Sequence, residues 1–150
     1  MSIASLGLIL VAILVGALPP LQAGINATIA GYHGHPLWGA LTNTVVASLA
    51  LLGLIVLLRV PGSDLRAVAG APAWSWAGGL MGAAMVLSAI ILAPRLGAAA
   101  FVSAMVVGTM TASVLIDHFG VVGFRPHPIS LQRIIGGALV VLGMILVQTD

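Results

Sequence analysis

Residues 37–58 read LWGALTNTVVASLALLGLIVLL, a stretch without a single charged side chain. The charge-free region extends back to residue 1, so the first Lys, Arg, Asp or Glu in the chain is Arg59. A charge at the centre of a bilayer costs about 2.5–3.5 kcal/mol on insertion scales, whereas a water-soluble surface requires charge. This region therefore predicts an integral membrane protein surrounded by lipid.

The composition of the whole chain supports the same conclusion. Hydrophobic residues make up 61% of the chain and charged residues 5%, against about 25% charged in a typical soluble domain. The mean hydropathy is +1.23. Cysteine is absent, which excludes a disulfide framework. The basic residues are isolated arginines without a basic run that could follow phosphates, so nucleic acid is not an expected partner.

Charges and prolines divide the chain into five apolar stretches, which predict an all-α bundle of five transmembrane helices in a single transmembrane domain over residues 1–150. About 20 residues cross the hydrocarbon core of a bilayer. The continuous Leu, Val, Ile and Ala runs lack the two-residue alternation of a membrane barrel. The first stretch is short, and we expect it to extend past Pro19-Pro20. The predicted spans are residues 3–18, 37–58, 74–93, 97–116 and 134–147.

The arginines predict the orientation of the chain. Four of the five lie in the loops after the second and fourth spans, and the loop after the third span holds only Arg95. Because cytoplasmic loops are enriched in arginine, we expect the N-terminus inside and the C-terminus outside. The difference is small, and insertion in both orientations is the alternative.

Two spans carry small residues at four-residue spacing, which lets helix backbones approach closely in lipid. These residues could pack within the chain or form a subunit interface. The stripe in span 97–116 is the longer one and the better candidate for an interface. The positions are Gly78, Gly82, Ala100, Ala104, Gly108 and Ala112.

Uncharged polar side chains at membrane depth are the candidates for contact with a substrate. Gln22 and Asn26 are four residues apart and would share one face if the helix resumes after the prolines. A broken helix beside two amides is typical of transporter cavities, although a solvated loop would explain both residues equally well. Asn43 lies inside the second span, where its amide needs a hydrogen-bond partner or a position near the interface.

Ionisable residues near the spans allow two interpretations. Asp117 and His118 lie at the end of span 97–116. They could take part in proton coupling, or Asp117 could simply be solvated or paired with Arg125. His33 and His35 form no metal-binding motif, and we expect them in a solvated loop. We find no nucleophile–base pair, phosphate-binding glycine loop or paired carboxylates, so we expect no enzyme activity, cofactor or metal.

Four short segments resemble the YdcZ-type, five-helix branch of the drug/metabolite transporter superfamily. The P-x-Q-x-x-x-N pattern ends at Asn26, and the other three segments follow at matching intervals as APRLGAA (93–99), LIDHFG (115–120) and PISLQRIIG (128–136). The chain departs from the pattern at Gly108-Thr109, where relatives often carry Gly-Gln. Thr109 therefore implies a different or weaker contact with substrate.

The resemblance implies half of a transporter, since larger members join two five-helix repeats of inverted topology around one pathway. We expect a homodimer, or a heterodimer with a related five-helix protein of opposite topology, in a bacterial inner membrane. Such a dimer would move small metabolites or drug-like molecules by alternating access, with Gln22, Asn26, Asn43 and Thr109 in the cavity wall. The alternative is a non-transporting subunit that stabilises a larger membrane complex. Amides that converge on one cavity would favour transport.

Overall fold

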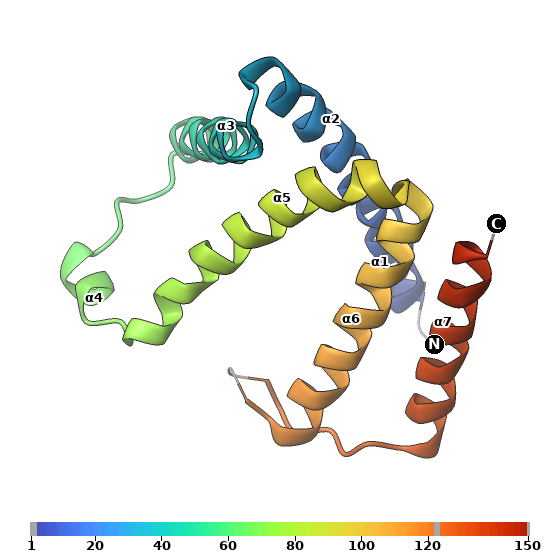
Figure 1. The fold of residues 1–150 in the computed structure, drawn as a ribbon. Helices are drawn as coiled ribbons and strands as arrows, with labels where there is room; N and C mark the ends of the chain where they lie inside the picture. The colour runs from blue at the N-terminus through green and yellow to red at the C-terminus, as the bar shows by residue number, and fades with distance from the viewer. Residues whose placement is uncertain (1–2, 122–123, 150) are drawn as a thin grey trace. The chain divides into compact units, whose positions relative to one another are not determined.

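The computed structural model describes residues 3–121 and 124–149, and these residues form helices and connecting segments (Figure 1). Within them, five helical segments are long and apolar enough to cross a bilayer, which confirms the predicted all-α architecture. In chain order the elements are α1 (Ile3–Gly16), α2 (Leu18–His33), α3 (Pro36–Leu57), α4 (Leu65–Ala69), the short 3₁₀ helix η1 (Ala73–Trp76), α5 (Ala77–Leu96), α6 (Ala98–Phe119) and α7 (Leu131–Gln148).

The first spanning segment contains α1 and α2, which are separated at Ala17. Pro19 and Pro20 lie in the first turn of α2, where backbone N–H groups have no acceptor within the helix. The two prolines are therefore compatible with the start of a helix at Leu18. α2 continues to His33 and ends at Gly34, whose φ of 75° is the left-handed conformation that glycine adopts easily. The interpretation of this stretch as a solvated loop is wrong.

α2 and α3 form a tight helical hairpin. Gly34 and His35 alone connect them, and the Nδ1 of His35 accepts a hydrogen bond from the backbone N–H of Leu37 at the start of α3. Near the turn the two backbones come unusually close. A Cβ atom built on Gly39 would lie 2.5 Å from the Cβ of Ala30. Only a glycine at position 39 permits this approach.

The first 95 residues form one compact unit, and its core consists mainly of small side chains. Ala30 of α2 and Ala40 of α3 are buried together with Ile90 of α5, and Val86 packs against them. Large aliphatic side chains instead lie on the outer surface, as expected for helices that face lipid. Close packing of small residues is the usual way in which helices associate in a membrane.

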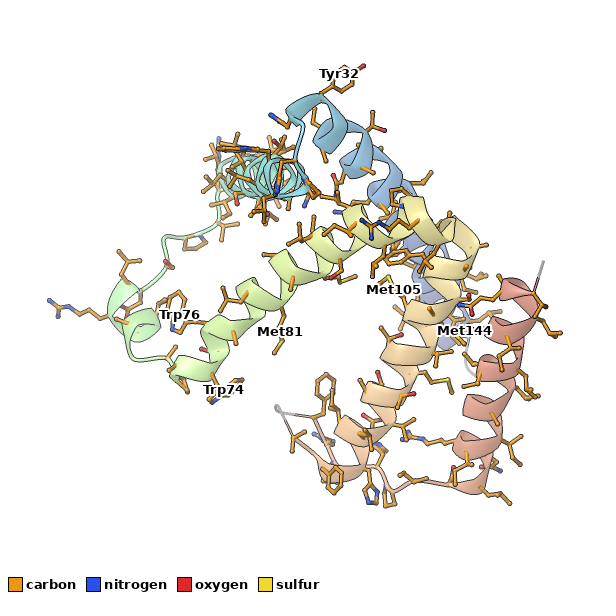
Figure 2. All side chains as sticks on the ribbon, in the orientation of Figure 1. Tyr32, Trp74, Trp76, Met81, Met105 and Met144 are labelled. Atoms are coloured by element: carbon orange, nitrogen blue, oxygen red, sulfur yellow. The ribbon has the colours of Figure 1, made fainter. Side chains whose placement is uncertain are left out.

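A polar segment connects α3 to α5 within the same unit. Asp64 caps the short helix α4, because its Oδ1 accepts hydrogen bonds from the backbone N–H groups of Arg66 and Ala67. Trp74 and Trp76 follow in η1, and both side chains are exposed (Figure 2). Exposed tryptophans at the start of a spanning helix suit the membrane interface.

Residues 96–150 form the second compact unit, in which α6 and α7 run antiparallel and pack side by side (Figure 1). Gly120 ends α6 in the left-handed conformation, with a φ of 59°. Ser130 caps α7, since its Oγ accepts a hydrogen bond from the backbone N–H of Arg133. The single transmembrane domain expected from the sequence stays a prediction.

The small-residue positions differ in how the chain uses them. Among the described residues, no atom outside its own helix lies within 4 Å of a Cβ built on Gly78, Gly82 or Gly108. Ala112 is also exposed, whereas Ala104 is half-buried, as is Ala100. Contacts within each unit therefore leave these glycines open, and a subunit interface along the stripe stays a prediction.

Candidate substrate cavity

Three amide side chains from α2 and α3 meet at a single oxygen atom. The Nε2 of Gln22 donates a hydrogen bond to the Oδ1 of Asn43 at 3.2 Å. The Nδ2 of Asn26 donates to the same oxygen, also at 3.2 Å. Gln22 and Asn26 share one face of α2 because they are four residues apart, and the hairpin brings Asn43 opposite them. We call these three residues the amide cluster.

The amide cluster lines a cavity of about 620 Å³ between α2 and α3. This volume lies within the range of about 300–1,000 Å³ that is typical of small-molecule sites. Aliphatic side chains form most of the wall, and the three amides of the cluster lie together in it. The lining residues are Leu18, Leu21, Gln22, Ile25, Asn26, Ile29, Thr42, Asn43 and Val46.

The cavity wall includes polar side chains but no ionisable group. Asn26 is almost fully buried, with 6% of its surface exposed, while Gln22 is exposed and Asn43 is half-buried. A primary amide has two N–H donors and one carbonyl acceptor. Within the described residues, the amide nitrogen of Asn43, the Oε1 of Gln22 and the Oδ1 of Asn26 make no protein hydrogen bond. One donor group and two acceptors therefore remain for a molecule in the cavity.

A second polar contact joins the wall of the cavity to the end of α2. The Nε2 of His33 lies 3.1 Å from the Oγ1 of Thr42, which precedes Asn43 in the chain. The imidazole also lies beside Trp38, with the ring centroids 6.4 Å apart. His33 is exposed, but it lies in a helix and contacts the cavity wall, so its expected place in a loop is wrong.

Sequence reasoning missed both the His33–Thr42 contact and the role of Gly39. The nine-residue separation of His33 and Thr42 becomes meaningful only once the two-residue turn at Gly34 is known. Gly39 had a weak signal, since Gly39-Ala40 is a pair of small residues in a span of larger ones. The small residues at four-residue spacing lie on other helices.

Thr109 belongs to the second unit, in α6. Its hydroxyl donates to backbone carbonyl oxygens of its own helix, those of Met105 at 2.9 Å and Val106 at 3.1 Å. The amide cluster is complete within α2 and α3 without Thr109. A role for Thr109 in a cavity wall remains a prediction.

Asp117 forms an ion pair with Arg133, with 3.1 Å between Oδ2 and Nη1, so Arg125 as its expected partner is wrong. The Ser130 cap places Arg133 in the first turn of α7, next to the end of α6. The two side chains are 31% and 36% exposed, respectively. The adjacent ring of His118 makes an edge-to-face contact with Phe119 at 4.9 Å. This pairing favours a structural role for Asp117 at the helix ends.

A family model described as "Putative inner membrane exporter, YdcZ" matches residues 7–146. No curated protein and no solved structure matches the chain. The matched region contains the amide cluster, the His33–Thr42 contact and the Asp117–Arg133 pair.

Proposed function

Since the chain belongs to the YdcZ family of inner membrane exporters, we propose that it exports small, uncharged amphipathic molecules through the cavity beside the amide cluster. The convergence of Gln22, Asn26 and Asn43 on one cavity carries this proposal. In a non-transporting subunit we would expect the amide side chains to lie apart, each with its own hydrogen-bond partner. Here two of them share one acceptor and leave hydrogen-bonding groups beside an open volume.

The character of the wall supports an uncharged substrate. No lining residue is ionisable, and the chain before Arg59 holds no Lys, Arg, Asp or Glu. A charged group entering this cavity would lose its hydration without gaining a counter-charge, which is strongly unfavourable. A neutral polar group can instead bond to the amide nitrogen of Asn43 and the Oε1 of Gln22. Its apolar part would contact the aliphatic wall.

We also propose that transport requires two chains of opposite orientation. Together they enclose one central pathway and open it alternately to the two sides of the membrane. The cavity walls come from α2 and α3 alone, so further helices are needed to enclose a substrate. The open position at Gly108 on α6 offers a surface for a neighbouring helix. A second copy or a related five-helix chain would supply this neighbouring helix.

Transport into liposomes tests the substrate class. We would compare labelled N-acetylleucinamide, N-acetylleucine and leucinamide, which share one side chain but are neutral, anionic and cationic. Purified protein should accelerate only the neutral solute above the leak of protein-free liposomes. Asn43→Leu should reduce this flux at least about tenfold, the scale of one lost hydrogen bond to a polar substrate. Ser48→Leu, on α3 outside the cavity lining, is the matched control.

Three outcomes are informative. Loss in Asn43→Leu but not in Ser48→Leu supports the cavity assignment. Equal flux in wild type and Asn43→Leu refutes it. If none of the three solutes moves and the amide variants change only stability, the non-transporting membrane subunit becomes the better explanation.

Assembly is tested separately by crosslinking and native mass spectrometry. Gly108→Leu should weaken the dimer, because a bulky side chain would hold the partner helix away. Gly53→Leu, at an equally open glycine of α3, should not. A stable and active Gly108→Leu dimer would refute the interface along α6.

A further inference from the structure

We propose that His33 is a proton-binding residue of this exporter and acts on the cavity through the hydroxyl group of Thr42. The proposal deepens the proposed function and rests on it. His33 is the last residue of the first spanning segment and is exposed. The end of a span lies near the membrane surface, where water can deliver protons to the ring. Its Nε2 lies 3.1 Å from the Oγ1 of Thr42, a residue of the cavity wall.

Protonation restricts the direction of this hydrogen bond. In neutral histidine, Nε2 either accepts from the Thr42 hydroxyl or donates to it, depending on the tautomer. In the imidazolium, both ring nitrogens carry hydrogen, and Nε2 can only donate. The hydroxyl hydrogen of Thr42 must then turn to another acceptor. A carbonyl of its own helix or a molecule in the cavity can take that hydrogen bond.

Thr42 differs from other threonines in the helices of this chain. Thr28, Thr44 and Thr111 each donate to the backbone carbonyl four residues earlier, at 2.9, 3.0 and 2.8 Å. Thr42 instead contacts His33. Its hydroxyl is therefore paired with an imidazole, a side chain type that can bind and release a proton.

The other ionisable groups of the first unit are engaged elsewhere or lie on other elements. α3, on which the His33 contact lies, has no ionisable side chain, and neither does α1. Tyr32 is 87% exposed and points away from the helices (Figure 2), while His35 caps α3. α5 packs on the hairpin and carries only Arg95, and Asp64 caps α4 beyond the end of α3. Among the residues that the structure describes, Thr42 is thus the side chain in hydrogen-bond contact with the His33 ring.

A link between proton binding and the cavity has a thermodynamic consequence. If protonation changes the donors available in the cavity, it changes the affinity for a polar solute. By reciprocity, the solute changes the proton affinity of His33 by the same factor. Exchange of protons for solute requires a coupling of this kind. Before Arg59 the chain offers only Tyr32, His33 and His35 as ionisable groups, and His33 contacts the cavity wall.

Nuclear magnetic resonance of the full chain in lipid nanodiscs tests this link without any solute. The side-chain amide signals of Asn43 should move with pH, in step with the ring signals of His33. His35→Asn should behave like wild type, since it removes the neighbouring imidazole but keeps a good helix cap. The pH response of Asn43 should be lost in His33→Gln and in Thr42→Val, which keeps the side-chain shape.

Transport of N-acetylleucinamide at a series of pH values gives the second measurement. Wild-type flux should change about fivefold or more across the titration of histidine, the lower end of typical coupling. His33→Gln should be flat, and Thr42→Ser should keep the pH dependence. A pH response of Asn43 that persists in His33→Gln, or that is absent in wild type, overturns the proposal. If wild type moves no solute at any pH, the proposed function fails, while the resonance result still decides the His33 link.

Discussion

Gly39 of α3 and Ala30 of α2 lie backbone against backbone, and this approach sets the spacing of the two helices that carry the amide cluster. A Cβ on Gly39 would also lie 3.1 Å from the carbonyl oxygen of Asn26, one of the three amide residues. Helix packing and site geometry therefore depend on the same glycine.

Substitution of Gly39 should damage both stability and transport. Gly39→Ala must push α2 away, because the new methyl group has no room, and overpacking of this kind costs about 1–3 kcal/mol. Gly53→Ala in the same helix meets open space and should keep or slightly raise stability. Thermal unfolding in detergent measures both. Equal stability of the two variants would show that the close approach is not needed.

The two hydrogen bonds of the amide cluster should differ in strength. Asn26 is almost fully buried and Gln22 is exposed at the cavity, so other polar groups can compete more easily for the bond from Gln22. Double-mutant cycles with alanine should give about 1–1.5 kcal/mol for Asn26–Asn43 and about 0.5 kcal/mol or less for Gln22–Asn43. A larger value for Gln22–Asn43 would contradict this order.

The Asp117–Arg133 ion pair should stabilise α6 against α7 only modestly. Both side chains are about one-third exposed, so we expect a coupling of about 0.2–1 kcal/mol in a double-mutant cycle. Arg125→Gln is the control and should not couple to Asp117. Asp117→Asn should also leave the pH dependence of transport intact, since we assign that to His33. A flat pH profile in Asp117→Asn would return the coupling role to the carboxylate.

The orientation of the chain is open to a direct test. The arginine distribution predicts a cytoplasmic N-terminus and an external C-terminus. Paired reporter fusions at Asp150, one active inside the cell and one outside, should give signal from the outside reporter. Signal from both would indicate dual insertion, and signal from the cytoplasmic reporter alone would contradict the prediction.

The five helices could be predicted because lipid leaves few alternatives for an apolar chain: every backbone group must be bonded within the segment. The residue at which α2 begins could not be predicted from the sequence. Pro19-Pro20 usually marks the end of a helix, and its tolerance here depends on the short break at Ala17, which places both prolines in a first turn. The length of α2, which excludes the alternative of a solvated loop, follows from that one local detail.

The site was predictable in part. The spacing of Gln22 and Asn26 indicates one helix face, and the position of Asn43 inside a span indicates that its amide needs a partner. The hydrogen bonds of Asn43 to the two amides of α2 depend on the register of the hairpin. The left-handed Gly34 and the contact at Gly39 determine that register. The predicted pairing of Asp117 with Arg125 is wrong for a similar reason. Arg125 is nearer in sequence, but the packing of α7 beside α6 brings Arg133 to Asp117.

The two-residue connection between α2 and α3 has a consequence for biosynthesis. All partners of the amide cluster lie within residues 18–46, so the hairpin can close while the ribosome is still adding the later helices. The hydrogen bonds of this recognition element involve no residue outside α2 and α3. Gene duplication or fusion could therefore pass it on intact to a longer chain.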